Sequence, residues 1–462
     1  MSLAPKENNF PLSKFESMLK TNSIYFFDSI EFEQIIHFYI DSAKNNLAKR
    51  AIDLGLKQHP NASVLRLLSV ELMIFDGEFE KADLLLNEIR AIEPSNAEVY
   101  VQQANIYSKK DEHFKAIESL KIALNFTDDE ADIFSMIGME FLYLDNFTEA
   151  RLNFSKCLDL DFEDYSALYN LIYCYDMQNL HKEAAEYLNV YLDRDPYCEI
   201  VWHQLGRQYF ILEKFEEAVR AFDFAVLIDE YFVGAYLEKA KSFEQLEKYE
   251  DAIENYKITL ELDDPASSYA LLRIGECYNE LNDTDSAISY FKKALHEDPL
   301  LDKGWYALSN LNFDLGKYLK ALYYVKKAIE IDEQNKYYWR GYAQIHLRLN
   351  LFEEAVSAFE KCIELEDFDL EIWLGLCDVQ CYLGDYDDAI ANLTKAKKWH
   401  LDIVEIEFRL GGLYLLVENF EEGFSHLRKA LGLNFKAQAI LKEYFPRVFK
   451  MKEVKEIINE FK

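Results

Sequence analysis

The chain has 462 residues, half of them hydrophobic, with 31 tyrosines and 33 phenylalanines, which supplies apolar surface for an extended core and excludes a disordered chain. It carries 50 basic and 83 acidic residues, and the resulting net charge of −33 repels phosphate backbones and anionic lipid, so we expect no nucleic-acid partner and no membrane role. No amino-terminal segment resembles a signal peptide and no stretch is long enough to span a bilayer, so we expect a soluble cytoplasmic protein.

Residues 1–28 are expected to form an amino-terminal capping segment. Four apolar residues after Pro11 recur on one face of a short helix: Leu12, Phe15, Met18 and Leu19. Asp28 is followed three residues later by Glu31, which is the spacing of a capping box. The sequence therefore predicts a short covering helix and then a second helix that begins directly after Asp28.

Residues 199–232 contain the helical spacing of apolar residues written twice. The first stretch has Trp202, Leu205, Gly206 and Tyr209, and the second has Ala218, Phe222 and Ala225. This pattern predicts two amphipathic helices with a break at residues 212–215. Because Gly206 and Ala218 are small, we expect the two helices to approach each other closely.

The order Trp-x-x-Leu-Gly-x-x-Tyr, then Ala-x-x-x-Phe-x-x-Ala, resembles the tetratricopeptide repeat, a helix-turn-helix unit with a period of 34 residues. The alanine recurs at this period, with one residue inserted near 263–268 and a final glycine: Ala48, Ala82, Ala116, Ala150, Ala184, Ala218, Ala252, Ala287, Ala321, Ala355, Ala389 and Gly423. The resemblance implies an all-α, right-handed superhelical solenoid of about twelve repeats over residues 29–437, with capping helices at 438–462. We expect no domain boundary within the array.

The fifth repeat departs from the pattern at the positions where its two helices should cross. Ile172 and Tyr191 are both large, whereas the equivalent residues of the sixth repeat are Gly206 and Ala225. We therefore expect a wider helix pair in the fifth repeat and a change of superhelical curvature near residues 165–198.

No catalytic, cofactor-binding or metal-binding motif is present. The sequence lacks a nucleophile elbow, a phosphate-binding glycine loop, a zinc-binding His-Glu-x-x-His and a dinucleotide fingerprint. Cys377 and Cys381 lie one helical turn apart, but no second pair at matching spacing follows, so reduced core thiols are the preferred interpretation. We expect a protein that is not an enzyme and that has no catalytic residue, no cofactor and no metal.

The family resemblance implies a binding surface, because the first helices of tetratricopeptide arrays line a concave groove. The groove positions of the fifth to tenth repeats supply these candidate peptide-binding residues: Asn170, Tyr173, His203, Arg207, Lys241, Arg273, Tyr306, Asn310, Arg340 and Arg348. Five of them are cations on an acidic chain, which favours a bound segment that carries acidic groups. Acidic groove residues such as Glu238, Glu244 and Glu276 intervene, so internal pairing of these charges is an equal alternative.

These observations favour a non-catalytic scaffold or adaptor that binds an extended peptide or a partner's segment in the groove. Two alternatives stay open. The chain could be a structural protein that self-associates through its terminal repeats or convex face, or a regulatory subunit of an enzyme encoded elsewhere. The ordered lysine, asparagine and arginine set by which some relatives clamp two carboxylates is missing, so the partner is not identified.

Overall fold

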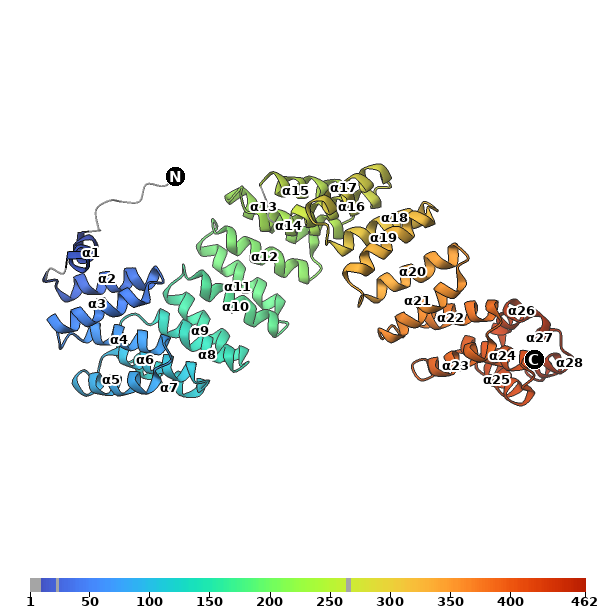
Figure 1. Ribbon diagram of the computed structural model, residues 1–462, viewed down its shortest axis with the longest axis horizontal. Coiled ribbons are helices and arrows are strands. Elements are labelled where there is room, and N and C mark those ends of the chain that lie inside the picture. Colours follow the sequence, from blue (N-terminus) through green and yellow to red (C-terminus); the bar gives the residue numbers. More distant parts are fainter. Residues whose placement is uncertain (1–9, 22–24, 263–266) are drawn as a thin grey trace. The chain divides into compact units, whose positions relative to one another are not determined.

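The computed structural model describes residues 10–21, 25–262 and 267–462, and the regular structure within these ranges is entirely helical (Figure 1). Twelve pairs of helices, each joined by a short turn, follow one another along the described ranges. Within each of two compact units, the second helix of a pair packs on the first helix of the next pair. The protein is therefore an all-α solenoid built from helix pairs.

The first unit ends at Pro196. It begins with the single helix α1 (Phe10–Thr21) and continues with five pairs: α2 (Ser29–Asp41) and α3 (Asn45–Gln58), α4 (Ser63–Phe75) and α5 (Phe79–Ile92), α6 (Ala97–Lys109) and α7 (His113–Ala123), α8 (Ala131–Tyr143) and α9 (Phe147–Leu160), α10 (Tyr165–Met177) and α11 (His181–Arg194).

The second unit is Tyr197–Lys462. Its seven pairs are α12 (Glu199–Ile211) and α13 (Phe215–Ile228), α14 (Val233–Gln245) and α15 (Tyr249–Glu261), α16 (Ser267–Glu280) and α17 (Thr284–Glu297), α18 (Asp302–Asp314) and α19 (Tyr318–Ile331), α20 (Lys336–Arg348) and α21 (Phe352–Glu364), α22 (Leu370–Leu383) and α23 (Tyr386–Ala396), α24 (Val404–Leu416) and α25 (Phe420–Leu433). Four short helices follow: η1 (Phe435–Gln438), α26 (Ala439–Tyr444), α27 (Pro446–Phe449) and α28 (Lys452–Glu460). The inserted residue near 263–268 falls partly on 263–266, which lie outside the described ranges.

Helix α1 covers the first pair, as its apolar face predicts. Phe15 is fully buried, and its ring lies edge-on to Phe27 and Phe32 at centroid distances of 5.9 and 6.2 Å. The capping box at the start of α2 is also confirmed. The Glu31 backbone N–H donates to Asp28 Oδ1 at 2.8 Å, and the Asp28 N–H donates to Glu31 Oε2 at 2.9 Å.

The recurring alanine lies on the buried side of every second helix. All eleven of these alanines have 0% exposed surface, and Gly423 is buried at the last position. Even one added methylene would therefore meet neighbouring atoms, because protein interiors are close-packed. This burial explains why the period is held so strictly.

The glycine of the first helix makes room for an aromatic ring. A Cβ atom built on Gly206 would lie 2.5 Å from Phe222 of the paired helix, and Gly138 and Gly275 face Phe154 and Phe291 in the same way. The close approach predicted at Gly206 is thus a contact between backbone and a phenylalanine ring. The small residue is needed because Phe222 is itself fully buried.

Each turn within the twelve described pairs contains one residue of positive φ. In the sixth pair this is Glu213, with φ of 58°, and the following Lys214 N–H donates to Tyr209 O at 2.9 Å, which closes the end of α12. Glycine occupies the position in only three turns, at Gly77, Gly316 and Gly384. The remaining turns hold side chains in a backbone conformation that L-residues adopt at a cost.

The wide fifth pair is confirmed. The backbones of α10 and α11 come close at far fewer positions than those of α12 and α13. Ile172 and Tyr191 are both buried, and the Tyr191 ring stacks on Phe162 at 4.0 Å while its hydroxyl donates to Phe162 O at 2.6 Å. The wider pair thus agrees with the large side-chain volume at these two positions.

Cys377 and Cys381 form a close thiol pair, with their Sγ atoms 3.8 Å apart. Cys377 is fully buried beside Trp373 and Ala389 and Cys381 is partly buried, which fits the interpretation of core thiols. Among the described residues, no group of histidine, cysteine, aspartate and glutamate side chains is arranged to hold a metal ion. In the same part of the chain, no helix combines the length and apolar character needed to cross a membrane.

Candidate peptide-binding surface

Each unit has a hollow on the surface formed by its first helices. In the second unit a groove of about 630 Å³ is lined by residues of α14, α16, α18 and α20. Three predicted residues line it, namely Arg273, Tyr306 and Asn310. We call this hollow the second-unit groove.

Arg273 of α16 is tied to carboxylates at the edge of the second-unit groove. Its Nε donates to Glu244 Oε1 at 3.1 Å, and its Nη1 donates to Glu276 Oε2 at 2.6 Å. Burial alone would lower the pKa of Arg273, but the hydrogen bond and charge of Glu244 and the charge of Glu276 outweigh it and raise that pKa. Arg273 is therefore charged but already neutralised across the seventh and eighth pairs.

Two further predicted cations are paired in the same manner. Arg340 Nη2 lies 2.9 Å from Asp367 Oδ2 and 3.1 Å from Asp369 Oδ2, and the Asp367 carboxylate is almost completely buried. Lys241 Nζ lies 2.8 Å from Glu238 Oε1 on its own helix. For these residues the structure shows the internal pairing that the sequence left as an alternative, and neither of them lines the second-unit groove.

His203 and Arg207 lie on α12. The His203 ring packs 4.8 Å from Phe232 and 5.7 Å from Phe222, and burial, helped by the nearby Arg207 charge, lowers its pKa to about 4. His203 is therefore neutral at pH 7. Arg207 Nη1 donates to Gln204 Oε1 at 3.1 Å.

Tyr306 of α18 contacts residues of the next first helix, α20, in addition to lining the groove. Its hydroxyl donates to Tyr337 O at 3.1 Å, its ring lies 4.7 Å from Tyr338, and burial raises its pKa. Asn310, one turn later on α18, is exposed to the groove. The exposed Arg348 lies outside this lining, with its guanidinium 5.9 Å from the Phe313 ring centroid.

Asn170 and Tyr173 belong to α10 in the first unit. Asn170 Nδ2 lies 3.4 Å from Met139 Sδ, and the half-exposed Tyr173 ring meets Phe147 edge-on at 6.2 Å. The ten predicted residues thus lie on first helices of both units, and the structure brings only three of them into one hollow.

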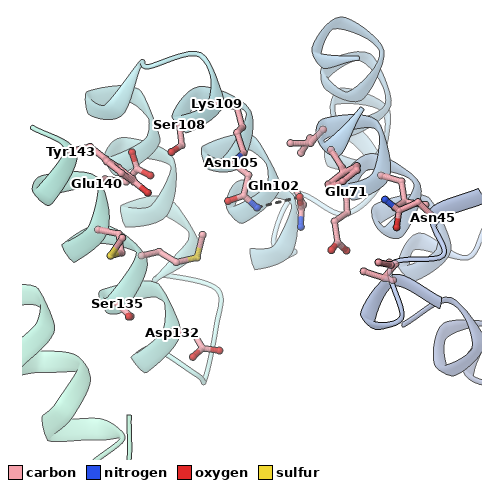
Figure 2. Close-up of a pocket in the computed structure, with 17 residues that line it drawn as sticks. Asn45, Glu71, Gln102, Asn105, Ser108, Lys109, Asp132, Ser135, Glu140 and Tyr143 are labelled. Atoms are coloured by element: carbon pink, nitrogen blue, oxygen red, sulfur yellow. Dashed lines mark hydrogen bonds between the residues drawn. The ribbon is translucent and has the colours of Figure 1, made fainter. Parts of the chain in front are cut away.

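The sequence prediction missed a larger hollow in the first unit. It measures about 750 Å³ and is lined mainly by α4, α6 and α8 (Figure 2). The polar lining residues in the figure include Glu71, Gln102, Asn105, Lys109, Asp132 and Glu140. We call it the first-unit groove.

The repeat register could have found the first-unit groove. Residues at the same first-helix positions as Arg273 and Glu276, counted back from the alanine of each second helix, are Gln102 and Asn105 in the third pair and Met136 and Met139 in the fourth. The candidate list started at the fifth repeat and so omitted them.

A family model described as tetratricopeptide repeat matches residues 135–197 and 237–301, and a second with the same description matches residues 302–335 and 337–369. These matches cover helix pairs of both units.

Two curated relatives come from Schizosaccharomyces pombe. The general transcriptional corepressor ssn6 is 30% identical over 115 residues, which are 24% of this chain and 10% of that protein. The DnaJ homolog subfamily C member 7 homolog is 22% identical over 196 residues, which are 42% of this chain and 37% of that protein. The chain thus spans well under half the length of either relative.

Among solved structures, the C-terminal part of a TPR repeat-containing protein from Cytophaga hutchinsonii is 15% identical, with a TM-score of 0.44. The match covers 52% of this chain and 99% of that one. From the repeated helix pairs, the buried alanine period and the matching family models, we conclude that this chain contains tetratricopeptide repeats.

Proposed function

We propose that this chain is a non-catalytic interaction scaffold whose first helices hold extended segments of partner proteins. The observation that carries the proposal is the presence, in each unit, of a groove lined by first-helix side chains from successive pairs. Volumes of about 750 and 630 Å³ exceed the space needed by single side chains and suit a short stretch of peptide.

The second-unit groove offers hydrogen-bonding and aromatic groups beside its charged side chains. Its lining contains the exposed Lys303 and Asn310 and the half-exposed Tyr337 beside the paired Arg273. Tyrosine is common at the energetic centres of protein interfaces, because it buries much area with little loss of conformational freedom. A segment held here would bind through its backbone and through apolar contacts, and the exposed Lys303 is available to an acidic group of the segment.

The test begins with the full chain as bait in a native lysate, followed by mass spectrometry and by affinity measurements on peptides tiled from each captured partner. Lys303→Glu places a negative charge in the second-unit groove without breaking a salt bridge that the structure shows. Lys320→Glu makes the same change of charge on α19, the second helix of the same pair, and is the matched control.

We expect Lys303→Glu to weaken a peptide that binds the second-unit groove by about tenfold, and Lys320→Glu to leave its affinity within a factor of about two. Equal affinities for the parent, for both lysine variants and for the first-unit variant described below would place binding outside both grooves. That result would contradict the proposal.

A further inference from the structure

The first-unit groove contains a carboxylate with no salt bridge among the described residues. Glu71 of α4 lines the groove and is drawn beside Gln102 of α6 in Figure 2. Glu140, another lining carboxylate, differs because its Oε2 lies 2.9 Å from His113 Nδ1. Burial raises the pKa of Glu71, the charge of His37 opposes that rise, and Glu98 and Asp41 add to it. The ionised form of Glu71 is therefore poorly compensated in the isolated chain.

The other charges that line the groove also favour a cation. Asp132 in the first turn of α8 is a third acidic group, and Lys109 is the only basic residue in the described lining. The lining of the first-unit groove therefore holds three carboxylates and one lysine, and of the carboxylates Glu140 is paired with His113.

Polar amides and apolar side chains complete the first-unit groove. Gln102 Nε2 donates to Glu98 Oε1 at 2.7 Å, and Asn105 Nδ2 lies 3.3 Å from Gln102 Oε1, so both amides are held in position. Met136 and Met139 of α8 supply flexible apolar surface within the same lining. Lysine and arginine combine an apolar stem with a charged end. The groove offers carboxylates to the charged end and apolar surface to the rest of a bound segment.

We infer that the first-unit groove binds an extended segment of a partner protein through a lysine or arginine side chain, with the charged end at Glu71 and with neighbouring apolar side chains of the segment against Met136 and Met139. The inference rests on the proposed function and gives the partner a chemistry opposite to the acidic segment expected from the sequence. Charge complementarity selects this occupant, because an acidic segment would bring its carboxylates toward Glu71 and Asp132.

The probe is an array of short immobilised peptides of randomised sequence, incubated with the full chain. The test variant is Glu71→Gln with Asp132→Asn, which removes two negative charges from the groove. The control is Asp53→Asn with Glu118→Gln, which makes the same pair of changes at exposed positions on α3 and α7, the second helices of the first and third pairs. Because both double variants change the net charge equally, the comparison separates groove binding from attraction by the whole acidic chain.

We expect the parent and the control to select peptides containing lysine or arginine, and the groove variant to bind the same peptides about tenfold more weakly. Circular dichroism and melting temperature check that each variant is folded. The inference would be overturned if the groove variant selected basic peptides as strongly as the parent does. It would also be overturned if the parent bound peptides without a preference for basic ones, although that result would leave the proposed function intact. Failure of the parent to bind any peptide on the array would overturn both.

Discussion

At the scale of single residues, the strict alanine period follows from a lack of space. Ala218 and Phe222 are fully buried on α13, and the Phe222 ring fills the volume that a side chain on Gly206 would need. The sequence identifies the recurring alanine because every second helix repeats the same steric requirement. It does not identify the ring as the group that occupies the space, because this depends on the rotamer that Phe222 adopts.

Replacing Ala218 with leucine should overpack the centre of the sixth pair. We expect a loss of about 1 to 3 kcal/mol in the free energy of unfolding, because the added methylenes have no cavity to enter. Arg220→Leu, at an exposed position on the same helix, controls for the change in helix propensity and surface apolarity. The stability of the two variants is measured by thermal and urea unfolding, with circular dichroism as the signal. Equal melting of parent and Ala218→Leu would show that the crossing is looser than described.

The groove residues were predictable only in part. Register alone places Arg273, Tyr306 and Asn310 on one surface, because each first helix presents the same positions. It does not say which carboxylate a cation will meet. Arg340 binds Asp367, a buried residue of the loop before α22, and loop conformation cannot be derived from helical periodicity.

At the scale of helices, a buried carboxylate connects three elements near the end of the second unit. Glu407 of α24 has 1% exposed surface, and its oxygens lie 2.5 Å from His426 Nδ1, 2.9 Å from Lys429 Nζ and 3.0 Å from Lys397 Nζ. His426 and Lys429 belong to α25, and Lys397 follows the last residue of α23. Burial raises the pKa of Glu407, but hydrogen bonds from the three basic side chains outweigh it and hold the pKa at about 2.

Glu407→Gln should therefore destabilise the second unit at neutral pH. We expect the free energy of unfolding to fall by about 1 to 3 kcal/mol, because Glu407 no longer pairs with the basic side chains around it. The loss is limited because Lys397 and Lys429 are partly exposed and regain some hydration. Glu254→Gln, at an exposed position on α15, is the matched control. Urea unfolding at pH 7 measures the difference.

The difference in stability between the parent and Glu407→Gln should depend on pH, because folding lowers the pKa of Glu407. The pKa of Glu407 is lower in the folded chain than its ordinary value of 4.5, so its contribution is complete above pH 4.5 and is lost as the pH falls toward 2. The difference in the free energy of unfolding between the parent and Glu407→Gln should therefore become smaller as the pH falls from 4.5, down to the lowest pH at which the parent still folds. A difference independent of pH would show that packing at Glu407, and not its charge, supplies the stability.

At the scale of the whole molecule, the fold was predictable because one short pattern specifies every pair. The alanine period continues from Ala184 to Ala218 without a slip, so periodicity does not mark the point at which the chain divides into two compact units, after Pro196. In the pair before that point, the large residues Ile172 and Tyr191 are buried and the backbones of α10 and α11 come close at few positions.

The helices after the last pair bear on whether copies of the chain associate. Val454, Ile457 and Ile458 of α28 are buried, and α28 packs on α25, which carries the buried Leu427 and Leu431. Helix α28 therefore keeps an apolar surface of the last pair away from water, as terminal elements of repeat arrays must. Covered in this way, the surface offers no ready contact to a second copy.

We expect light scattering during size-exclusion chromatography to give the monomer mass of 54.3 kDa, unchanged over a range of protein concentration. Deletion of residues 452–462 should expose the apolar side chains on α25 and produce a mass that rises with concentration, because exposed apolar surface drives association. Lys455→Ala, at an exposed position on α28, should behave like the parent. A parent mass that already increases with concentration would favour the self-associating structural protein over the monomeric scaffold, since association would then occur with α28 in place.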